Sequence, residues 1–171
     1  MNIIQYLFVA LSYLPQAYAD EMERGTVAFA LRFWKANFLI NFLYCVLAWL
    51  FYAVGYEAPL SQIQMGLWPI MFFDMVTMCY KFGDQPAMCC FFPLPFTMKY
   101  YPLFIAVIFF LILDMNWSIL IGVGLGYLDQ RGHLGWINNS SRSIQKWQNR
   151  FPFKMYKDRP NFVKVNENGQ R

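Results

Sequence analysis

Two short apolar runs, joined by a polar tripeptide, constrain the fold more than any other part of the sequence. Residues 100–113 and 117–128 contain no charged side chain, and Asp114-Met115-Asn116 lies between them. A tripeptide that polar is costly in the middle of a membrane and short enough for a tight turn, so the two runs are predicted to form a helical hairpin. The second run contains three glycines, of which the first and last have the small-xxx-small spacing that lets two membrane helices approach closely. The residues predicted to pack in this way are Gly122, Gly124 and Gly126.

The amino-acid composition favours an integral membrane protein. The chain is 58% hydrophobic and only 14% charged, whereas a soluble domain is about half apolar and about a quarter charged. Aromatic residues make up 20% of the chain, and membrane proteins place such rings at headgroup level as well as in helix packing. A soluble protein with a large buried core is the alternative, and the scarcity of charge disfavours it.

Five apolar segments are predicted to cross the membrane, so the expected fold is an all-α polytopic bundle. They are residues 3–20, 27–55, 60–80, 100–113 and 117–128. Pro69 is expected to interrupt the third segment. Residues 87–98 are apolar but contain two prolines, so an interfacial or re-entrant segment is expected there rather than a continuous helix.

The basic residues set the predicted orientation. When the five segments are threaded back and forth, all fourteen Lys and Arg residues fall on one side. The positive-inside rule places that side, with the C-terminus, in the cytosol or in the mitochondrial matrix. The sequon at residues 138–140 lies on the same side, so it is predicted to stay unglycosylated.

Three polar residues inside the predicted spans are candidate functional groups. Asn37 and Asn41 are four residues apart, so they share a helix face and are expected to hydrogen-bond a neighbouring helix. Asp74 is a carboxylate at membrane depth, where a charge is costly and usually faces protein or water. Asp74 either has a functional role or is structural, sitting near the membrane edge or paired with a polar neighbour, and the structural interpretation is preferred.

The chain divides into a predicted membrane domain at residues 1–130 and a basic tail at residues 131–171. The tail holds nine of the fourteen basic residues and only two acidic ones. Apolar residues fall at helical spacing among these charges, so one interpretation is a short basic helix on an anionic membrane surface. A solvated tail, or a tail bound along a partner protein, is the other. The residues predicted to contact lipid or a partner are Arg142, Lys146, Trp147, Arg150 and Lys154.

Nothing in the sequence predicts a metal, cofactor or nucleic-acid site. The single histidine, His133, and the absence of a C-x-x-C pair argue against zinc. The thiols are expected to behave as small buried hydrophobic groups. They are Cys45, Cys79, Cys89 and Cys90.

Four stretches, at residues 19–29, 88–103, 114–116 and 120–128, together resemble in order and spacing the derlins, which are rhomboid-like membrane proteins without protease activity. Residues 88–103 (MCCFFPLPFTMKYYPL) are similar to the aromatic and proline-containing start of the fifth derlin core helix, and residues 114–116 occupy the short polar turn after it. Residues 120–128 (LIGVGLGYL) resemble the glycine-containing final helix, and residues 19–29 (ADEMERGTVAF) the junction after the second core helix. The resemblance covers about residues 1–135 and implies a derlin-like helical bundle.

Two departures from the derlin pattern bear on function. A derlin has six core helices, whereas this sequence begins at the segment that corresponds to the second, so the first helix and its long loop are expected to be missing. The derlin tail usually carries a short glycine-rich motif that binds a cytosolic unfoldase, and residues 168–171 are at most a remnant of it. Both departures weaken the expectation of a role in protein translocation.

The resemblance also predicts that the chain is not an enzyme. A rhomboid protease needs a serine in a G-x-S-G context and a histidine on its last helix. Residues 64–67 (QMGL) contain no serine, and Ile119 stands about where the histidine belongs. Neither Ser61 nor Ser118 has a histidine in range, because His133 follows the last predicted span, so hydrolysis has no activated nucleophile.

The sequence is therefore compatible with three functions. The preferred one is a non-catalytic scaffold, an accessory subunit of a large membrane complex such as a mitochondrial respiratory complex, with other integral membrane proteins and anionic lipids as partners. The second is a derlin role in endoplasmic-reticulum-associated degradation, the retrotranslocation of misfolded proteins across a thinned bilayer. The third, an intramembrane enzyme or ion carrier built on Asp74 and Asn41, rests only on isolated polar residues. The expected membrane is accordingly the mitochondrial inner membrane or that of the endoplasmic reticulum.

Overall fold

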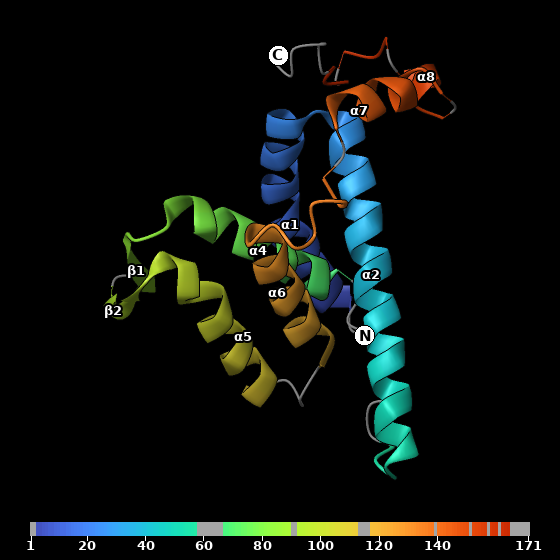
Figure 1. The fold of residues 1–171 in the computed structure, drawn as a ribbon. Coiled ribbons are helices and arrows are strands. Elements are labelled where there is room, and N and C mark those ends of the chain that lie inside the picture. The colour runs from blue at the N-terminus through green and yellow to red at the C-terminus, as the bar shows by residue number, and fades with distance from the viewer. Residues whose placement is uncertain are drawn as a thin grey trace. The chain divides into compact units, whose positions relative to one another are not determined.

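The computed structural model describes residues 3–57, 67–89, 92–112, 117–138, 140–150, 152–156, 158–160 and 162–164. Within these residues the fold is mostly helical, with seven α-helices, one 3₁₀ turn and one pair of short strands. The elements are α1 (Ile3–Arg24), α2 (Thr26–Ala53), α4 (Trp68–Phe82), β1 (Pro86–Cys89), β2 (Phe92–Thr97), η1 (Met98–Tyr100), α5 (Tyr101–Ile112), α6 (Trp117–Gln130), α7 (Ser141–Gln148) and α8 (Phe153–Tyr156) (Figure 1).

The chain forms two compact units. Unit 1 contains Met1–Lys35 together with Leu134–Arg171, and unit 2 contains Ala36–His133. Helix α2 contributes its first turns to unit 1 and the rest to unit 2. The basic tail shares a unit with α1 and the start of α2, and the predicted division of the chain at residue 130 stays a prediction.

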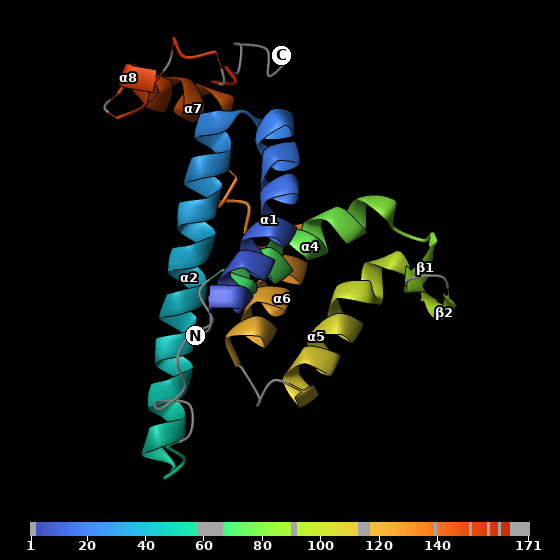
Figure 2. The ribbon, with the colours of Figure 1, turned by 180° about the vertical axis from the view of Figure 1, so that it is seen from behind.

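Helix α2 has 28 residues and is uninterrupted (Figure 2). Among the described residues it alone is both long and apolar enough to cross a membrane, and 22% of its most apolar window is buried. A span of about 20 residues crosses a bilayer core of about 30 Å, so α2 is long enough. By length and composition alone, a signal sequence near the N-terminus has the same properties.

Helix α4 starts at Trp68, and Pro69 lies in its first turn. Proline fits this position because the first backbone N–H groups of a helix have no partner within it. Pro69 therefore marks a helix start within the predicted third span, and the prediction that it interrupts this segment stays a prediction. Residues 58–66 of the predicted third span lie outside the described residues.

The proline-containing segment before the predicted hairpin is not helical, as expected. It forms an antiparallel strand pair, in which Pro86 pairs with Thr97 and a register irregularity follows Pro86. Pro93 and Pro95 are tolerated in β2 because a two-stranded sheet has only edge strands, whose backbone N–H groups need not all be paired. The strands themselves were not predicted.

The two short helices predicted from the apolar runs are present. Helix α5 has 12 residues and α6 has 14, with bounds within two residues of the predicted ones. Rings from the two helices meet near the connection, where the centroids of Phe110 and Trp117 are 5.3 Å apart. The connecting residues 113–116 lie outside the described residues.

The end of α4, the start of α5 and the end of α6 come together. The backbone N–H of Lys99 donates to the carbonyl of Gly83, 3.3 Å away, and the Tyr127 hydroxyl donates to the carbonyl of Lys99. The Lys99 ammonium also lies 2.8 Å from the Asp84 carboxylate, and this contact lowers the pKa of Asp84 below its ordinary value. Three helices that alternate in direction meet in this way.

In unit 1, the junction between α1 and α2 holds part of the tail. Gly25 turns the chain there with a φ of 90°, which favours glycine. The backbone N–H of Thr26 donates to the Val163 carbonyl over 3.1 Å, and the Val163 N–H donates to the Thr26 hydroxyl over 2.9 Å. The tail is therefore fastened to its own chain, which argues against the interpretation of a freely solvated tail.

The cysteine side chains were predicted to be buried, and this prediction can be compared with the structure at Cys45 and Cys79. It is confirmed at one of the two. Cys79 is buried in α4, as expected. Cys45 is exposed on α2, because its helix presents that side to the surroundings rather than to a neighbouring helix. The side chains of Cys89 and Cys90 lie outside the described residues.

Candidate functional site

The closest helix contact in unit 2 joins α4 and α6 through two glycines. A Cβ atom added at Gly122 would lie 2.3 Å from the carbonyl oxygen of Pro69. One added at Gly126 would lie 2.8 Å from the Cβ of Val76. The two helices run in the same direction, since residues that advance along α6 meet residues that advance along α4. The predicted role of Gly122 and Gly126 in helix packing agrees with this geometry.

Gly124 behaves differently from the two glycines beside it. No heavy atom of the described residues lies within 4 Å of a Cβ added there, and the residue is exposed. Because residues two apart point to nearly opposite sides of a helix, Gly124 faces away from α4. The prediction that Gly124 packs against a helix does not hold for the part of the chain that the structure describes.

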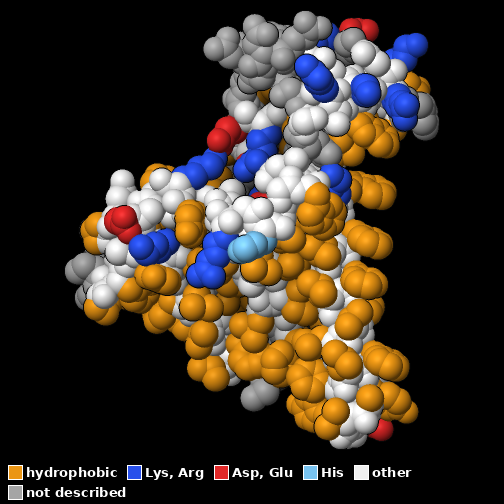
Figure 3. Space-filling view, in the orientation of Figure 1, with side chains coloured by type: hydrophobic (Ala, Val, Ile, Leu, Met, Phe, Trp, Pro, Cys, Tyr) orange, Lys and Arg blue, Asp and Glu red, His pale blue; other side chains and the backbone are white. Residues whose placement is uncertain are grey.

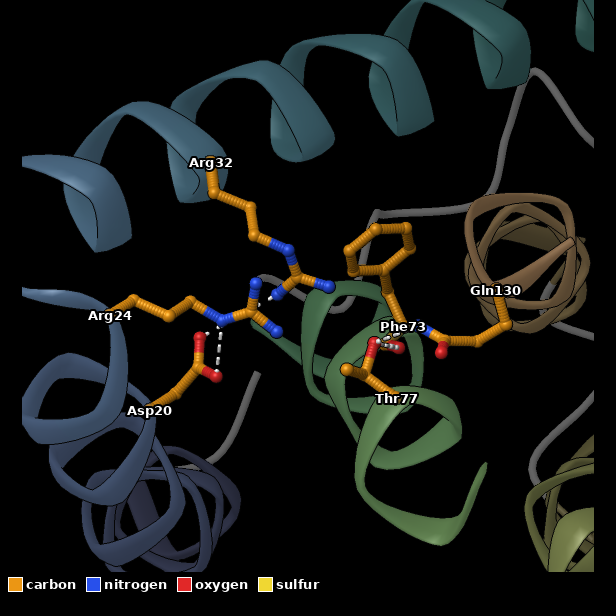
Figure 4. A network of polar contacts seen from close by, with 6 residues as sticks. All are labelled: Asp20, Arg24, Arg32, Phe73, Thr77 and Gln130. Carbon is orange, nitrogen blue, oxygen red and sulfur yellow. Dashed lines mark hydrogen bonds and ion pairs between the residues drawn. The ribbon is translucent and has the colours of Figure 1, made fainter. Parts of the chain in front are cut away.

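A polar contact continues the α4–α6 interface beyond the glycines. The Gln130 amide donates to the Thr77 hydroxyl over 3.2 Å, and that hydroxyl donates to the Phe73 carbonyl in its own helix over 3.5 Å (Figure 4). Thr77 is buried, so a hydrogen bond offsets the cost of removing its hydroxyl from water. This contact was not predicted, although Gln130 continues the four-residue spacing of the glycines.

The predicted intramembrane polar residues do not form one site. The Asn41 amide donates to the Asn37 backbone carbonyl over 2.7 Å and to its side-chain oxygen over 3.1 Å. These bonds lie within α2, so the expected hydrogen bond to a neighbouring helix is replaced by a local one. Asp74 is buried on α4 and has an interaction partner, and its structural interpretation stays a prediction.

A buried charge cluster in unit 1 was missed by sequence analysis. The Asp20 carboxylate accepts a hydrogen bond from the Arg24 Nε over 2.7 Å and lies 3.6 Å from the Arg32 guanidinium (Figure 4). The side chains of Arg32 and Asp20 are only 4% and 9% exposed. The pairing links the end of α1 to the first turns of α2, and such buried pairs are strongly destabilised when one partner is removed.

The basic tail forms the amphipathic helix α7, followed by the short helix α8. Ile144 and Gln148 are buried on one side of α7, and Arg142 and Lys146 are exposed on another. Ser140 caps the helix, because its side chain accepts a hydrogen bond from the Ser143 N–H. Lys and Arg side chains gather on this segment, whereas hydrophobic side chains cover the visible side of α2 (Figure 3).

Unit 1 also contains an apolar cavity of about 500 Å³. Its lining residues come from the start of α2 and from the tail: Ala30, Leu31, Trp34, Trp147, Pro152 and Phe153. Of the five tail residues predicted to contact lipid or a partner, Trp147 lines the cavity. The other four, Arg142, Lys146, Arg150 and Lys154, are exposed basic residues of the same segment. The contribution of α2 could not be read from the sequence, because Trp34 is far from Trp147 along the chain.

The hydroxyl and imidazole considered for catalysis are far apart. Ser118 is buried in the first turn of α6, and His133 is exposed beyond its end. The intervening helix spans about 20 Å at 1.5 Å per residue, which is much longer than the hydrogen bond that a nucleophile and its base require. Ser61 lies outside the described residues.

No family model, curated protein or solved structure matches the chain.

Proposed function

We propose that the chain is a non-catalytic integral membrane protein, a derlin-like bundle that serves as an accessory subunit of a larger membrane complex. The observation that carries this proposal is the exposed surface of α2. From Ala36 to Ala53 the helix has no charged residue, and many of its large apolar side chains are exposed. They include Phe38, Phe42, Val46, Trp49, Leu50 and Tyr52. An apolar surface of this length needs lipid or a partner protein to cover it.

The lengths of the other helices support insertion of α4, α5 and α6 as short spans beside α2. They have 15, 12 and 14 residues, about 22, 18 and 21 Å at 1.5 Å per residue. These lengths are below the bilayer core of about 30 Å, which suits a locally thinned membrane or burial among helices of other subunits. The proposed bundle thus has about five spans, with α1 as the remaining one.

The proposed partners are other integral membrane proteins. In unit 2, Leu43, Val46, Leu47 and Leu50 of α2 form a shallow apolar groove with Ile121 of α6, about 310 Å³ in volume. A groove lined by aliphatic side chains accepts a helix or an acyl chain. A respiratory complex of the mitochondrial inner membrane is the setting we favour, with the C-terminus in the matrix.

A second candidate function is the derlin role in degradation from the endoplasmic reticulum. The short helices α5 and α6 favour it, because a short hairpin thins the bilayer around it and lowers the barrier to moving a substrate across. In that case the C-terminus would lie in the cytosol, where the exposed tail could meet soluble partners.

Extraction and native electrophoresis of the tagged protein test the proposal. We expect the chain to stay with the membrane in alkaline carbonate, and to migrate after mild detergent extraction with a large complex at fixed stoichiometry. Release by carbonate would contradict membrane integration. Recovery with a cytosolic unfoldase, ubiquitin ligases and misfolded clients, instead of a stable complex, would support the second function in place of the first.

Cysteine labelling of intact organelles tests the number of spans. In a variant without the native cysteines, we expect Glu57→Cys to react from the side opposite to Lys99→Cys, Arg131→Cys and Lys164→Cys. The reason is that an odd number of spans must separate Glu57 from the three basic positions. Labelling of all four positions from one side would rule out the threading, and an α2 that acts alone as a span would place Glu57 with Lys99.

A further inference from the structure

We propose that the cavity between α2 and the tail binds one acyl chain of an anionic phospholipid, with the headgroup held by the basic side chains of residues 140–156. This inference rests on the proposed membrane location. It adds a defined lipid site, formed within unit 1, to the general expectation that the tail meets a membrane.

The lining of the cavity determines the chemistry of what can enter it. Three of the lining side chains are aromatic, and the others are those of Ala30, Leu31 and Pro152. None of the six carries a charge or a hydrogen-bonding group other than the indole N–H. A volume of about 500 Å³ lies within the range of about 300–1,000 Å³ typical of ligand pockets. The occupant is therefore apolar, at least in the part that enters.

The cavity opens at the surface beside two tryptophans. Trp34 is 76% exposed and Trp147 is 41% exposed, although both line the cavity. Tryptophan is enriched where the hydrocarbon of a membrane meets its headgroups, because the ring is apolar and the N–H is polar. Lys35, next to Trp34, is followed by the uncharged part of α2, so the proposed span begins at the level of the cavity.

Charge complementarity selects an anionic amphiphile over a neutral one. Residues 140–156 contain four basic residues and no Asp or Glu. All four are exposed, and among the described residues none of them has an ion-pair partner. They are Arg142, Lys146, Arg150 and Lys154. Arg150 and Lys154 flank Pro152 and Phe153 of the cavity wall, so a phosphate above the cavity has cations within the same segment of chain.

A phospholipid satisfies both parts of this surface at once. An acyl chain fills the apolar cavity, and its phosphate and anionic headgroup meet the guanidinium and ammonium groups at the rim. A hydrophobic helix of a partner protein would fill the cavity but leave the four cations without anions. A soluble anion would meet the cations but leave the cavity empty.

Photolabelling and lipid retention test the site in the full-length protein. The purified protein is exchanged into mild detergent that contains either phosphatidylglycerol or phosphatidylcholine. The two lipids have identical acyl chains, and in each lipid one acyl chain carries a photoreactive group. We expect one phosphatidylglycerol to remain bound in native mass spectrometry. We also expect its label on the peptides that contain Trp34 and Phe153. Phosphatidylcholine should be retained at least about tenfold less.

Two variants separate the headgroup from the acyl chain. Arg150→Gln combined with Lys154→Gln should weaken phosphatidylglycerol binding at least about tenfold, since each basic residue near a membrane surface contributes severalfold. Ala30→Trp should abolish labelling of the cavity because the indole ring of the new side chain occupies it. The matched control, Arg131→Gln combined with Lys164→Gln, removes two exposed cations outside residues 140–156 and should leave binding unchanged.

Three results would overturn the inference: equal retention of the two lipids, no effect of the Arg150 and Lys154 substitutions, or labelling confined to other helices. A photo-cross-link from the cavity to another protein in native membranes would show a protein occupant instead. Carbonate extraction of the native membranes that contain the same variants keeps the two proposals distinguishable. A membrane-integrated chain without lipid selectivity contradicts only the lipid site, whereas a chain released by carbonate contradicts the proposed function.

Discussion

Replacing Gly122 by alanine is expected to destabilise the α4–α6 pair by at least about 1–3 kcal/mol, the usual cost of adding atoms to a packed interface. The added Cβ would lie 2.3 Å from the Pro69 carbonyl oxygen, and this neighbour is backbone at the start of α4. It cannot rotate away as a side chain does, so the helices must separate. Unfolding of the purified protein in mixed micelles, followed by circular dichroism, measures the loss.

Gly124→Ala is the matched control for this prediction. It adds the same methyl group to the same helix, where no heavy atom of the described residues lies within 4 Å. Because glycine in a helix costs about 0.5–1 kcal/mol relative to alanine, the control should be neutral or slightly stabilising. Equal destabilisation by the two substitutions would show that α6 does not pack on α4 through Gly122.

Arg32→Met is expected to lower the free energy of unfolding by about 3 kcal/mol. This loss is at the lower end of the range of about 3–5 kcal/mol that breaking a buried ion pair costs. The Arg32 side chain is 4% exposed, and the Asp20 carboxylate 3.6 Å away is 9% exposed. Removal of the guanidinium leaves a buried carboxylate with only Arg24 beside it in the cluster. The lower end is expected because Arg24 stays at 2.7 Å. Unfolding in mixed micelles, followed by circular dichroism, measures this loss as well.

Two further variants show whether the loss belongs to the pair. Arg131→Met removes an exposed arginine and should change stability by less than about 0.5 kcal/mol. When Arg32→Met is combined with Asp20→Asn, the double variant should lose less than the sum of the single losses, because the second substitution removes the charge that the first left unpaired. Strictly additive losses would mean that Asp20 and Arg32 do not interact.

The helical hairpin could be predicted because its signals are local. Charge is absent from both runs and the polar tripeptide at residues 114–116 separates them, so the bounds of α5 and α6 could be predicted to within two residues. The contact of Gly122 and Gly126 followed from their spacing alone. Gly124 was included wrongly, although the same helical geometry, applied to a spacing of two residues, turns it away from α4.

Contacts between distant residues could not be predicted from one sequence. Asp20 and Arg32 are each visible as charges near a turn, but their pairing depends on how α1 and α2 pack. The strand pair at residues 86–97 was missed for a related reason, because prolines exclude a helix without specifying a strand partner. Nothing in the sequence distinguishes Trp34 from the other aromatic residues. It lines a cavity only because the tail packs against α2.

The hydrogen bonds between Thr26 and Val163 determine the order in which the two units can fold during synthesis of the chain. These residues are 137 positions apart, so Val163 leaves the ribosome long after α1 and α2 have been made. Helices α4, α5 and α6 have all their mutual contacts within one continuous stretch and can fold as it emerges. Unit 1 is completed only when the C-terminal residues arrive. A chain cut short in the tail would therefore have folded helices α4, α5 and α6 but an incomplete unit 1, which quality-control factors could recognise.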